Sequence, residues 1–81
     1  MTNPVEFLNG RIVINPDVCN GRPTIRGKRI TVQSVLEYLG SGDSVADILA
    51  EYPMLEPEDI RACLMFAGQL MNQRYDLVKV A

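Results

Sequence analysis

Apolar residues recur at helical spacing in three separate stretches of this chain. In each stretch their offsets are close to 0, 3, 4 and 7, which is the spacing of one face of an α-helix. The three sets are Val32, Val35, Leu36 and Leu39; Val45, Ile48, Leu49 and Tyr52; and Ile60, Cys63, Leu64, Ala67 and Met71. This pattern predicts helices over about residues 32–39, 44–52 and 57–72.

Polar residues, glycine and proline mark the ends of the predicted helices. Thr31 can cap the first helix, and Gly40 can follow that helix in a left-handed conformation. Ser44 with Asp47 three residues later resembles a capping box. Pro57 suits the first turn of the third helix, because its missing N–H has no intrahelical partner there. Local chemistry therefore supports the bounds that the hydrophobic spacing predicts.

The residues before the first helix show the patterns of strands and turns. Arg11–Ile14 is mostly β-branched and is stopped by an Asn-Pro pair, so it is predicted to be a strand. The following loop is rich in proline and glycine, and residues 23–25 and 29–31 can add short extended pieces. Such a small β element must rest on the helices to be stable. Residues 1–10 end in an Asn-Gly turn and are predicted to be a frayed N-terminal extension.

These elements predict one domain over residues 11–72, with the β element at 11–31 and a C-terminal tail at 73–81. A chain of 81 residues is too short for more than one ordinary domain. The second helix is short, and a tight break separates it from the third, as in a helix-turn-helix. The sequence thus predicts a mainly α fold, a three-helix cluster of helix-turn-helix type preceded by a short N-terminal β element.

Composition removes several classes of function. The chain has no histidine and two cysteines, Cys19 and Cys63, which are expected to be reduced. A Cys/His zinc site, a Ser-His-Asp triad and a Cys-His nucleophile pair are therefore excluded, and no cofactor or metal is expected. No apolar run approaches the roughly 20 residues of a membrane helix, and no signal-peptide pattern is present, so a cytoplasmic protein is expected.

Carboxylate chemistry is the one catalytic alternative that residue counts leave open. Such an enzyme would use Asp43, Asp47 or Glu51. These residues lie at a helix start, where capping and compensation of the helix dipole already explain them. We therefore predict a protein that is not an enzyme.

The net charge of −2 hides a separation of charge along the chain. Residues 11–30 hold five basic residues and one acidic residue, whereas residues 31–81 hold three basic and eight acidic residues. Basic side chains on a shaped loop can contact phosphates or base edges. The predicted nucleic-acid-binding residues are Arg22, Arg26, Lys28 and Arg29. The alternative is ordinary solvated charge on a loop.

The same loop has the features of a structural turn. Gly21 and Gly27 permit positive φ or a close approach of backbone, and Pro23 fixes the chain direction. Ile25 and Ile30 are expected to anchor the loop to the core.

The third predicted helix carries more apolar surface than one face needs. Every residue over 62–67 is apolar, and Ala62, Met65 and Phe66 project away from the Ile60–Leu64 face. A helix that is apolar all round must be covered on both sides. We predict that these three residues bind a partner protein, most simply in a two-fold homodimer. The alternative is that the N-terminal strand and loop fold back over them.

Four segments together resemble the small bacterial domain-of-unknown-function family 433. They are an Ile/Val strand ending in Asn-Pro, a Gly-x-Pro-x-Ile-x-Gly-x-Arg-Ile motif, a helix ending in Tyr-Pro, and a Leu-x-x-x-(Asp/Glu)-Ile-Arg helix. In this chain the four segments are, in order, Arg11–Pro16, Gly21–Ile30, Ile48–Pro53 and Leu55–Arg61. One departure is Lys28, where the family usually has threonine.

The resemblance implies a homeodomain-like three-helix fold and an antitoxin-like role. Family members often look like the antitoxin half of toxin–antitoxin gene pairs, beside a toxin that resembles PIN-domain nucleases. Such a protein would bind its toxin and could also bind its operator DNA. The acidic residues Glu56, Glu58 and Asp59 at the start of the third helix disfavour a DNA-reading helix. The alternative function is a stand-alone homodimeric DNA-binding transcriptional regulator.

Overall fold

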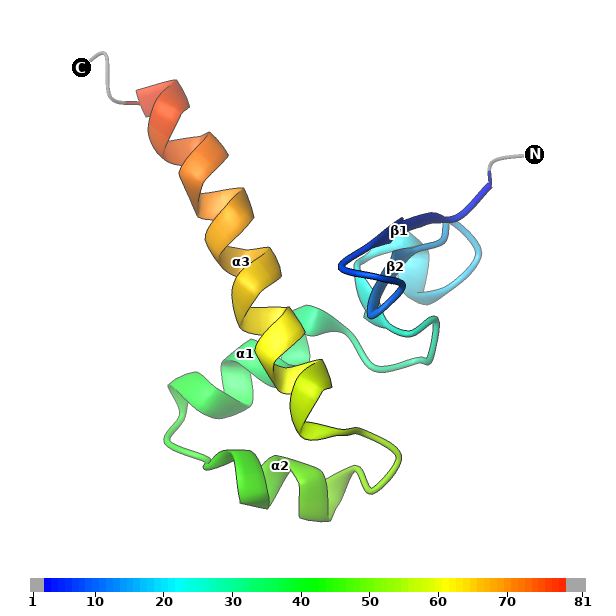
Figure 1. Cartoon of the computed structure of the whole chain (residues 1–81), viewed down its shortest axis with the longest axis vertical. Coiled ribbons are helices and arrows are strands. Elements are labelled where there is room, and N and C mark those ends of the chain that lie inside the picture. The colour runs from blue at the N-terminus through cyan, green and yellow to red at the C-terminus, as the bar shows by residue number, and fades with distance from the viewer. Residues whose placement is uncertain (1–2, 79–81) are drawn as a thin grey trace.

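The computed structural model describes residues 3–78, and the side chains of residues 3–72. Three short strands precede three helices in this part of the chain (Figure 1). The elements are β1 Val5–Phe7, β2 Ile12–Ile14, β3 Thr24–Ile25, α1 Val32–Gly40, α2 Val45–Glu51 and α3 Pro57–Val78, with one turn of 3-10 helix, η1, at Cys19–Gly21. None of these helices combines the length and hydropathy needed to span a bilayer.

The strands form one antiparallel sheet in the order β1-β2-β3. Val5 pairs with Ile14 and Phe7 pairs with Ile12, so residues from the predicted N-terminal extension belong to the sheet. The turn between β1 and β2 reverses the chain through left-handed backbone at Leu8, Asn9 and Gly10, with φ values of +55, +58 and +81. This four-residue turn, residues 8–11, brings β2 back along β1.

The three helices predicted from hydrophobic spacing are present, with caps of the expected chemistry. The Thr31 side chain accepts a hydrogen bond from the Ser34 N–H at 3.1 Å. Ser44 and Asp47 form a reciprocal capping box at the start of α2. Gly40, however, lies inside α1, and the left-handed residue after this helix is Gly42, with a φ of +103.

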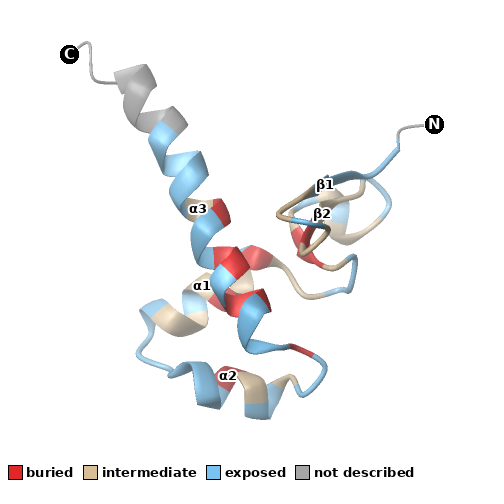
Figure 2. Cartoon of the chain, viewed as in Figure 1, coloured by how far each residue is buried: buried red, intermediate tan, exposed pale blue. Residues whose placement is uncertain are grey.

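The first half of α3 is the centre of the fold. It packs against α1, α2 and β2, and the buried residues gather where these elements meet (Figure 2). The sheet, α1, α2, the following loop and α3 all contribute to this core. Its apolar members are Ile12, Ile25, Val32, Val35, Ile48, Leu55, Ile60, Ala62, Cys63 and Phe66.

The sheet covers one side of α3 directly. The rings of Phe7 on β1 and Phe66 on α3 lie with centroids 5.2 Å apart and planes inclined by 60°. This tilted arrangement is favourable for aromatic pairs. Phe66 is 4% exposed as a result, whereas its neighbour Met65 is 50% exposed.

The predicted fold class, a mainly α homeodomain-like helix-turn-helix, is wrong. A three-stranded antiparallel sheet packs on α3 and supplies part of the core, so the fold combines a sheet with three helices. Hydrophobic spacing detects each helix, but it carries no information on how the helices are arranged. α3 also continues to Val78, past the predicted end at residue 72, and its C-terminal half projects from the body (Figure 1).

Replacing Phe66 with alanine tests the packing of the sheet on α3. We expect Phe66→Ala to lower the free energy of unfolding by about 3–5 kcal/mol, because it removes a buried ring and the packing of that ring on Phe7. Met65→Ala is the matched control and should change stability by less than about 1 kcal/mol. Urea unfolding followed by circular dichroism measures both, and equal effects would contradict this packing.

Candidate functional site

A buried carboxylate on α3 pairs with two arginines, one directly before β2 and one in the turn directly after β3. Asp59, in the first turn of α3, is fully buried. Its Oδ1 accepts hydrogen bonds from Arg11 Nη1 at 2.7 Å and Arg26 Nε at 3.1 Å. Its Oδ2 accepts from Arg26 Nη2 at 2.8 Å and from the Glu56 backbone N–H at 2.8 Å. Both oxygens are therefore satisfied, as a buried charge requires.

The pKa values of this cluster follow from these contacts. Burial alone would raise the pKa of Asp59, but hydrogen bonds from Arg11, the Glu56 backbone and Arg26 outweigh it and lower the pKa below the usual value. Hydrogen bonds to Glu56, at 2.6 Å, and to Asp59 raise the pKa of Arg11. The cluster is thus a fixed ionic contact rather than a source of protons at neutral pH.

Arg26 reaches Asp59 from a left-handed backbone conformation. Its φ is +51 and that of Gly27 is +73, and the turn is closed by the Lys28 N–H donating to the Ile25 carbonyl at 2.9 Å. Arg26 Nη2 also donates to the Met54 carbonyl at 2.7 Å. The turn therefore holds the loop before α3 as well as α3 itself.

The predicted nucleic-acid-binding residues do not share one environment. Arg26 is held by Asp59, whereas Arg22, Lys28 and Arg29 are exposed. Among the residues with described side chains, no ion pair includes any of these three. The freely presented positive charge on the loop is thus smaller than the sequence suggests.

The predicted structural residues of the motif shape this loop. Gly21 has a φ of +78, and the Pro23 carbonyl accepts a hydrogen bond from the Val32 N–H at 3.0 Å, just where α1 begins. Ile25 is fully buried and its N–H donates to the Ile30 carbonyl at 3.0 Å, while Ile30 packs against the core. The motif therefore forms a closed hairpin between η1 and α1.

The predicted partner-binding residues are divided between the core and the surface. Ala62 and Phe66 are covered by their own chain, and Met65 is half-exposed. The sequence pattern placed Leu64 and Met71 on the same apolar face as the buried Ile60 and Cys63, but Leu64 and Met71 are more than half exposed. We define the α3 apolar face as the exposed large apolar side chains among residues 57–72 of this helix, namely Leu64, Met65, Leu70 and Met71.

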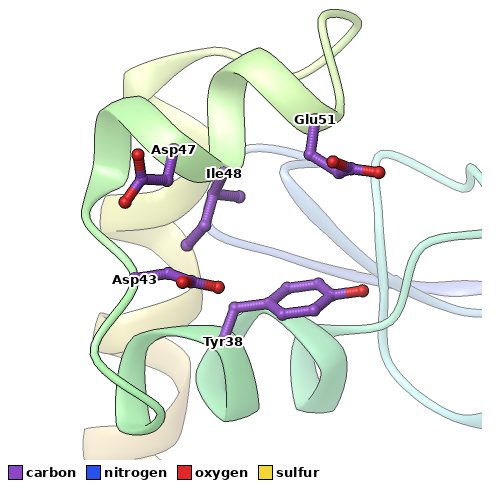
Figure 3. Close-up of a pocket in the computed structure, with 5 residues that line it drawn as sticks. All are labelled: Tyr38, Asp43, Asp47, Ile48 and Glu51. Carbon is purple, nitrogen blue, oxygen red and sulfur yellow. The ribbon is translucent and has the colours of Figure 1, made fainter.

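A small acidic cavity lies between α1 and α2 (Figure 3). It has a volume of about 200 Å³ and is lined by Tyr38, Asp43, Asp47, Ile48 and Glu51. Hydrogen bonds from the Ser44 backbone and side chain lower the pKa of Asp47. The Tyr38 hydroxyl lies 2.8 Å from that of Tyr52, and this hydrogen bond raises the pKa of Tyr52. The lowered pKa keeps Asp47 ionised, so Asp47 is not a general acid at neutral pH.

Two further observations concern nucleophilic chemistry and metal binding. Burial and the charge of Asp59 raise the pKa of the Cys63 thiol to about 12, so this group is a poor nucleophile. Within the described residues, no group of three or more acidic or cysteine side chains is placed to hold a metal ion.

A second hollow, of about 220 Å³, lies between α2 and α3. It is lined by Val45, Pro57, Ile60, Arg61 and Leu64. Its wall is mainly apolar, and Leu64 makes it continuous with the α3 apolar face.

Replacing Asp59 with asparagine tests the buried ionic contact. We expect Asp59→Asn to lower the free energy of unfolding by about 3–5 kcal/mol at neutral pH, because Arg26 loses its counter-charge and Arg11 keeps only Glu56. In the wild type, the contribution of ionised Asp59 to the free energy of unfolding is complete above the usual aspartate pKa of 3.8. This contribution is lost as the pH falls through the lower pKa that Asp59 has in the folded state. The variant should lack this acid-dependent loss. Urea unfolding at a series of pH values measures both effects.

Glu58→Gln is the matched control, since Glu58 is an exposed carboxylate in the same turn. It should change stability by no more than about 0.5 kcal/mol. If the two variants had the same stability and pH profile, Asp59 would not hold the fold together.

Comparison with known proteins places this fold in a family. The model of the family described as "Protein of unknown function (DUF433)" matches residues 12–67. The uncharacterized protein y4eO of Sinorhizobium fredii is 34% identical over 56 residues, which cover 69% of this chain and 25% of that protein. The chain thus spans about a quarter of this relative's length.

A solved structure is similar over most of the described fold. The crystal structure of a DUF433 member from Anabaena variabilis has a TM-score of 0.73 and 36% sequence identity to this chain, covering 79% of this chain and 63% of that one. The match of the family model extends from β2 into α3 and includes the hairpin motif and Asp59. The resemblance inferred from the sequence motifs is therefore confirmed, and the chain belongs to the DUF433 family.

Proposed function

We propose that this protein is a non-enzymatic, antitoxin-like regulatory protein that acts by binding a partner polypeptide. The observation that supports the proposal is the α3 apolar face, whose members are 45–62% exposed on the helix that projects from the body. Exposed apolar surface of this kind, here spread over more than one side of the helix, is typical of protein interaction sites.

The α3 apolar face can supply part of the energy of such a contact. Complete burial of a leucine or methionine stabilises by roughly 1.5–3 kcal/mol, and these four side chains are about half exposed. Covering them would contribute roughly 3–6 kcal/mol before the costs of association. Further contacts around the face would be needed for tight binding.

The chemistry of the polar residues also favours binding over catalysis. Asp59 is occupied by two arginines, and Asp47 is occupied by its capping box. The buried Cys63 thiol has a raised pKa. The family resemblance suggests a toxin similar to PIN-domain nucleases as the partner, encoded beside this protein.

Co-expression with the product of the adjacent gene tests the proposal. The wild-type chain should co-purify with that product, and Leu70→Glu should weaken the complex roughly tenfold or more, because a charge would enter an apolar contact. Met54→Glu is the control, since Met54 is 49% exposed but lies in the loop before α3. Failure of the wild-type chain to bind, or equal binding by both variants, would contradict the proposal.

A second candidate is a stand-alone homodimeric regulator that binds DNA. One observation favours it, the exposure of Arg22, Lys28 and Arg29 on the loop from η1 to α1. Three cations can hold phosphates, although Arg26 and Arg11 are engaged with carboxylates inside the chain.

Binding to the protein's own promoter at several salt concentrations tests this second candidate. Replacing Arg22, Lys28 and Arg29 with alanine should weaken binding and reduce the salt slope by about one for each phosphate that is no longer neutralised. Arg61→Ala removes an exposed cation from α3 and should have little effect. Binding that is unaffected by the triple change would remove this candidate.

A further inference from the structure

A stretch of twelve residues in α3 is unusual because it carries no charge. Between Arg61 and Arg74 the sequence holds no acidic or basic residue. Residues 68–72 of this run are all exposed, on the part of the helix that stands away from the body (Figures 1 and 2). Exposed helix surface usually carries charged side chains, so this run has the composition of an interface core rather than of free surface.

One stripe of this run has a symmetrical order of side-chain sizes. Leu64, Ala67, Gly68 and Met71 follow one another along the helix as large, small, small and large. Leu64 is 52% exposed and Met71 is 62% exposed. A Cβ atom at Gly68 would meet no heavy atom within 4 Å, so another backbone can approach closely there. We name these four residues the outer stripe.

We propose that a second copy of this chain covers the outer stripe, in a two-fold antiparallel contact centred between Ala67 and Gly68. This order places Leu64 of each chain beside Met71 of the other and the small residues face to face. The inference rests on the proposed function, because it names the occupant of part of the α3 apolar face. Leu70 lies on another side of the helix and stays available to a different partner.

The absence of charge on the outer stripe favours a second copy of the chain as its occupant. In a two-fold contact each surface patch meets its own copy, so any net charge on the patch repels itself. The acidic surface of Asp43, Asp47 and Glu51 would face this penalty, as would the basic turn of Lys28 and Arg29. The outer stripe has no charge of either sign. Two copies can therefore share the stripe itself without like-charge repulsion, and the nearest cations, Arg61 of one chain and Arg74 of the other, come level only beyond its ends.

The hollow between α2 and α3 extends the surface that a second copy would cover. It adjoins the outer stripe at Leu64, and its lining also includes Val45, Pro57, Ile60 and the cation Arg61. In the antiparallel contact, the backbone of the second chain's α3 beyond Met71 would run toward this hollow. The stripe alone is smaller than a standard interface of about 800 Å² on each partner, so this continuity matters for stability. Arg61 lies at the end of the uncharged run, where crossing helices diverge.

Solution mass provides the first test. Light scattering or sedimentation should give twice the 9.0 kDa of a single chain. Leu64→Glu and Met71→Glu should each raise the dissociation constant at least tenfold, because a carboxylate would be buried against apolar groups. Gln69→Glu is the control, being exposed on α3 but outside the stripe, and should remain dimeric. Circular dichroism shows whether each variant keeps its helices.

Cysteine cross-linking tests the position of the two-fold axis. In a Cys19→Ser background, Gly68→Cys should form a disulfide-linked dimer under mild oxidation, whereas Gln69→Cys should not. Cys63 is buried and does not interfere. A wild-type monomer at all concentrations, or cross-linking at residue 69 but not at 68, would overturn the inference.

The two proposals fail in different ways. A monomer that captures the adjacent gene's product through Leu70 would end the inference but retain the proposed function. A dimer that captures no partner would retain the inference and count against the antitoxin-like role.

Discussion

The contact on which the structure depends is the buried carboxylate of Asp59 with Arg11 and Arg26. In the sequence, Arg11 lies 48 positions and Arg26 lies 33 positions before Asp59. An unpaired charge in this position would be strongly destabilising, so the three segments must come together in one arrangement. Arg26 holds a φ of +51, which is uncommon for a residue with a Cβ atom. The ionic contact gives a physical reason for this conformation, because the left-handed turn directs the guanidinium toward α3.

The position of the sheet then determines which side of α3 is covered. Because Arg11 immediately precedes β2, its contact with α3 brings the sheet, and with it Phe7, against Phe66. Six consecutive apolar residues, 62–67, are thereby divided between an inner side and an outer side. The side chains on the inner side are buried by other residues of the same chain. Leu64 and Met65 remain outside, and the helix continues beyond Phe66 with nothing of the described chain packed around it.

The sequence predicts the parts of this structure that arise from short-range physics. Helical spacing and capping chemistry are local, so the helices and the Ser44–Asp47 box follow from residues a few positions apart. β1 was not predicted, although the Asn-Gly pair in its turn is a hairpin signal, because the strand has only three residues and its turn begins with left-handed backbone at Leu8. The charge separation along the chain was also incomplete evidence of an external partner, since two of the basic residues pair with carboxylates inside the chain. Long-range pairing of this kind leaves no periodic signal.

The length of α3 provides the strongest physical argument for a binding role. Isolated helices shorter than about 12–15 residues are marginal in water, and residues 68–72, just beyond Phe66, are all exposed. Gly68 weakens this region further, by about 1 kcal/mol relative to alanine in a helix interior. A side chain at this position would meet no steric obstacle within the chain. Glycine is therefore not required by the monomer's own packing, whereas a second helix crossing at this point would use the close approach that glycine permits.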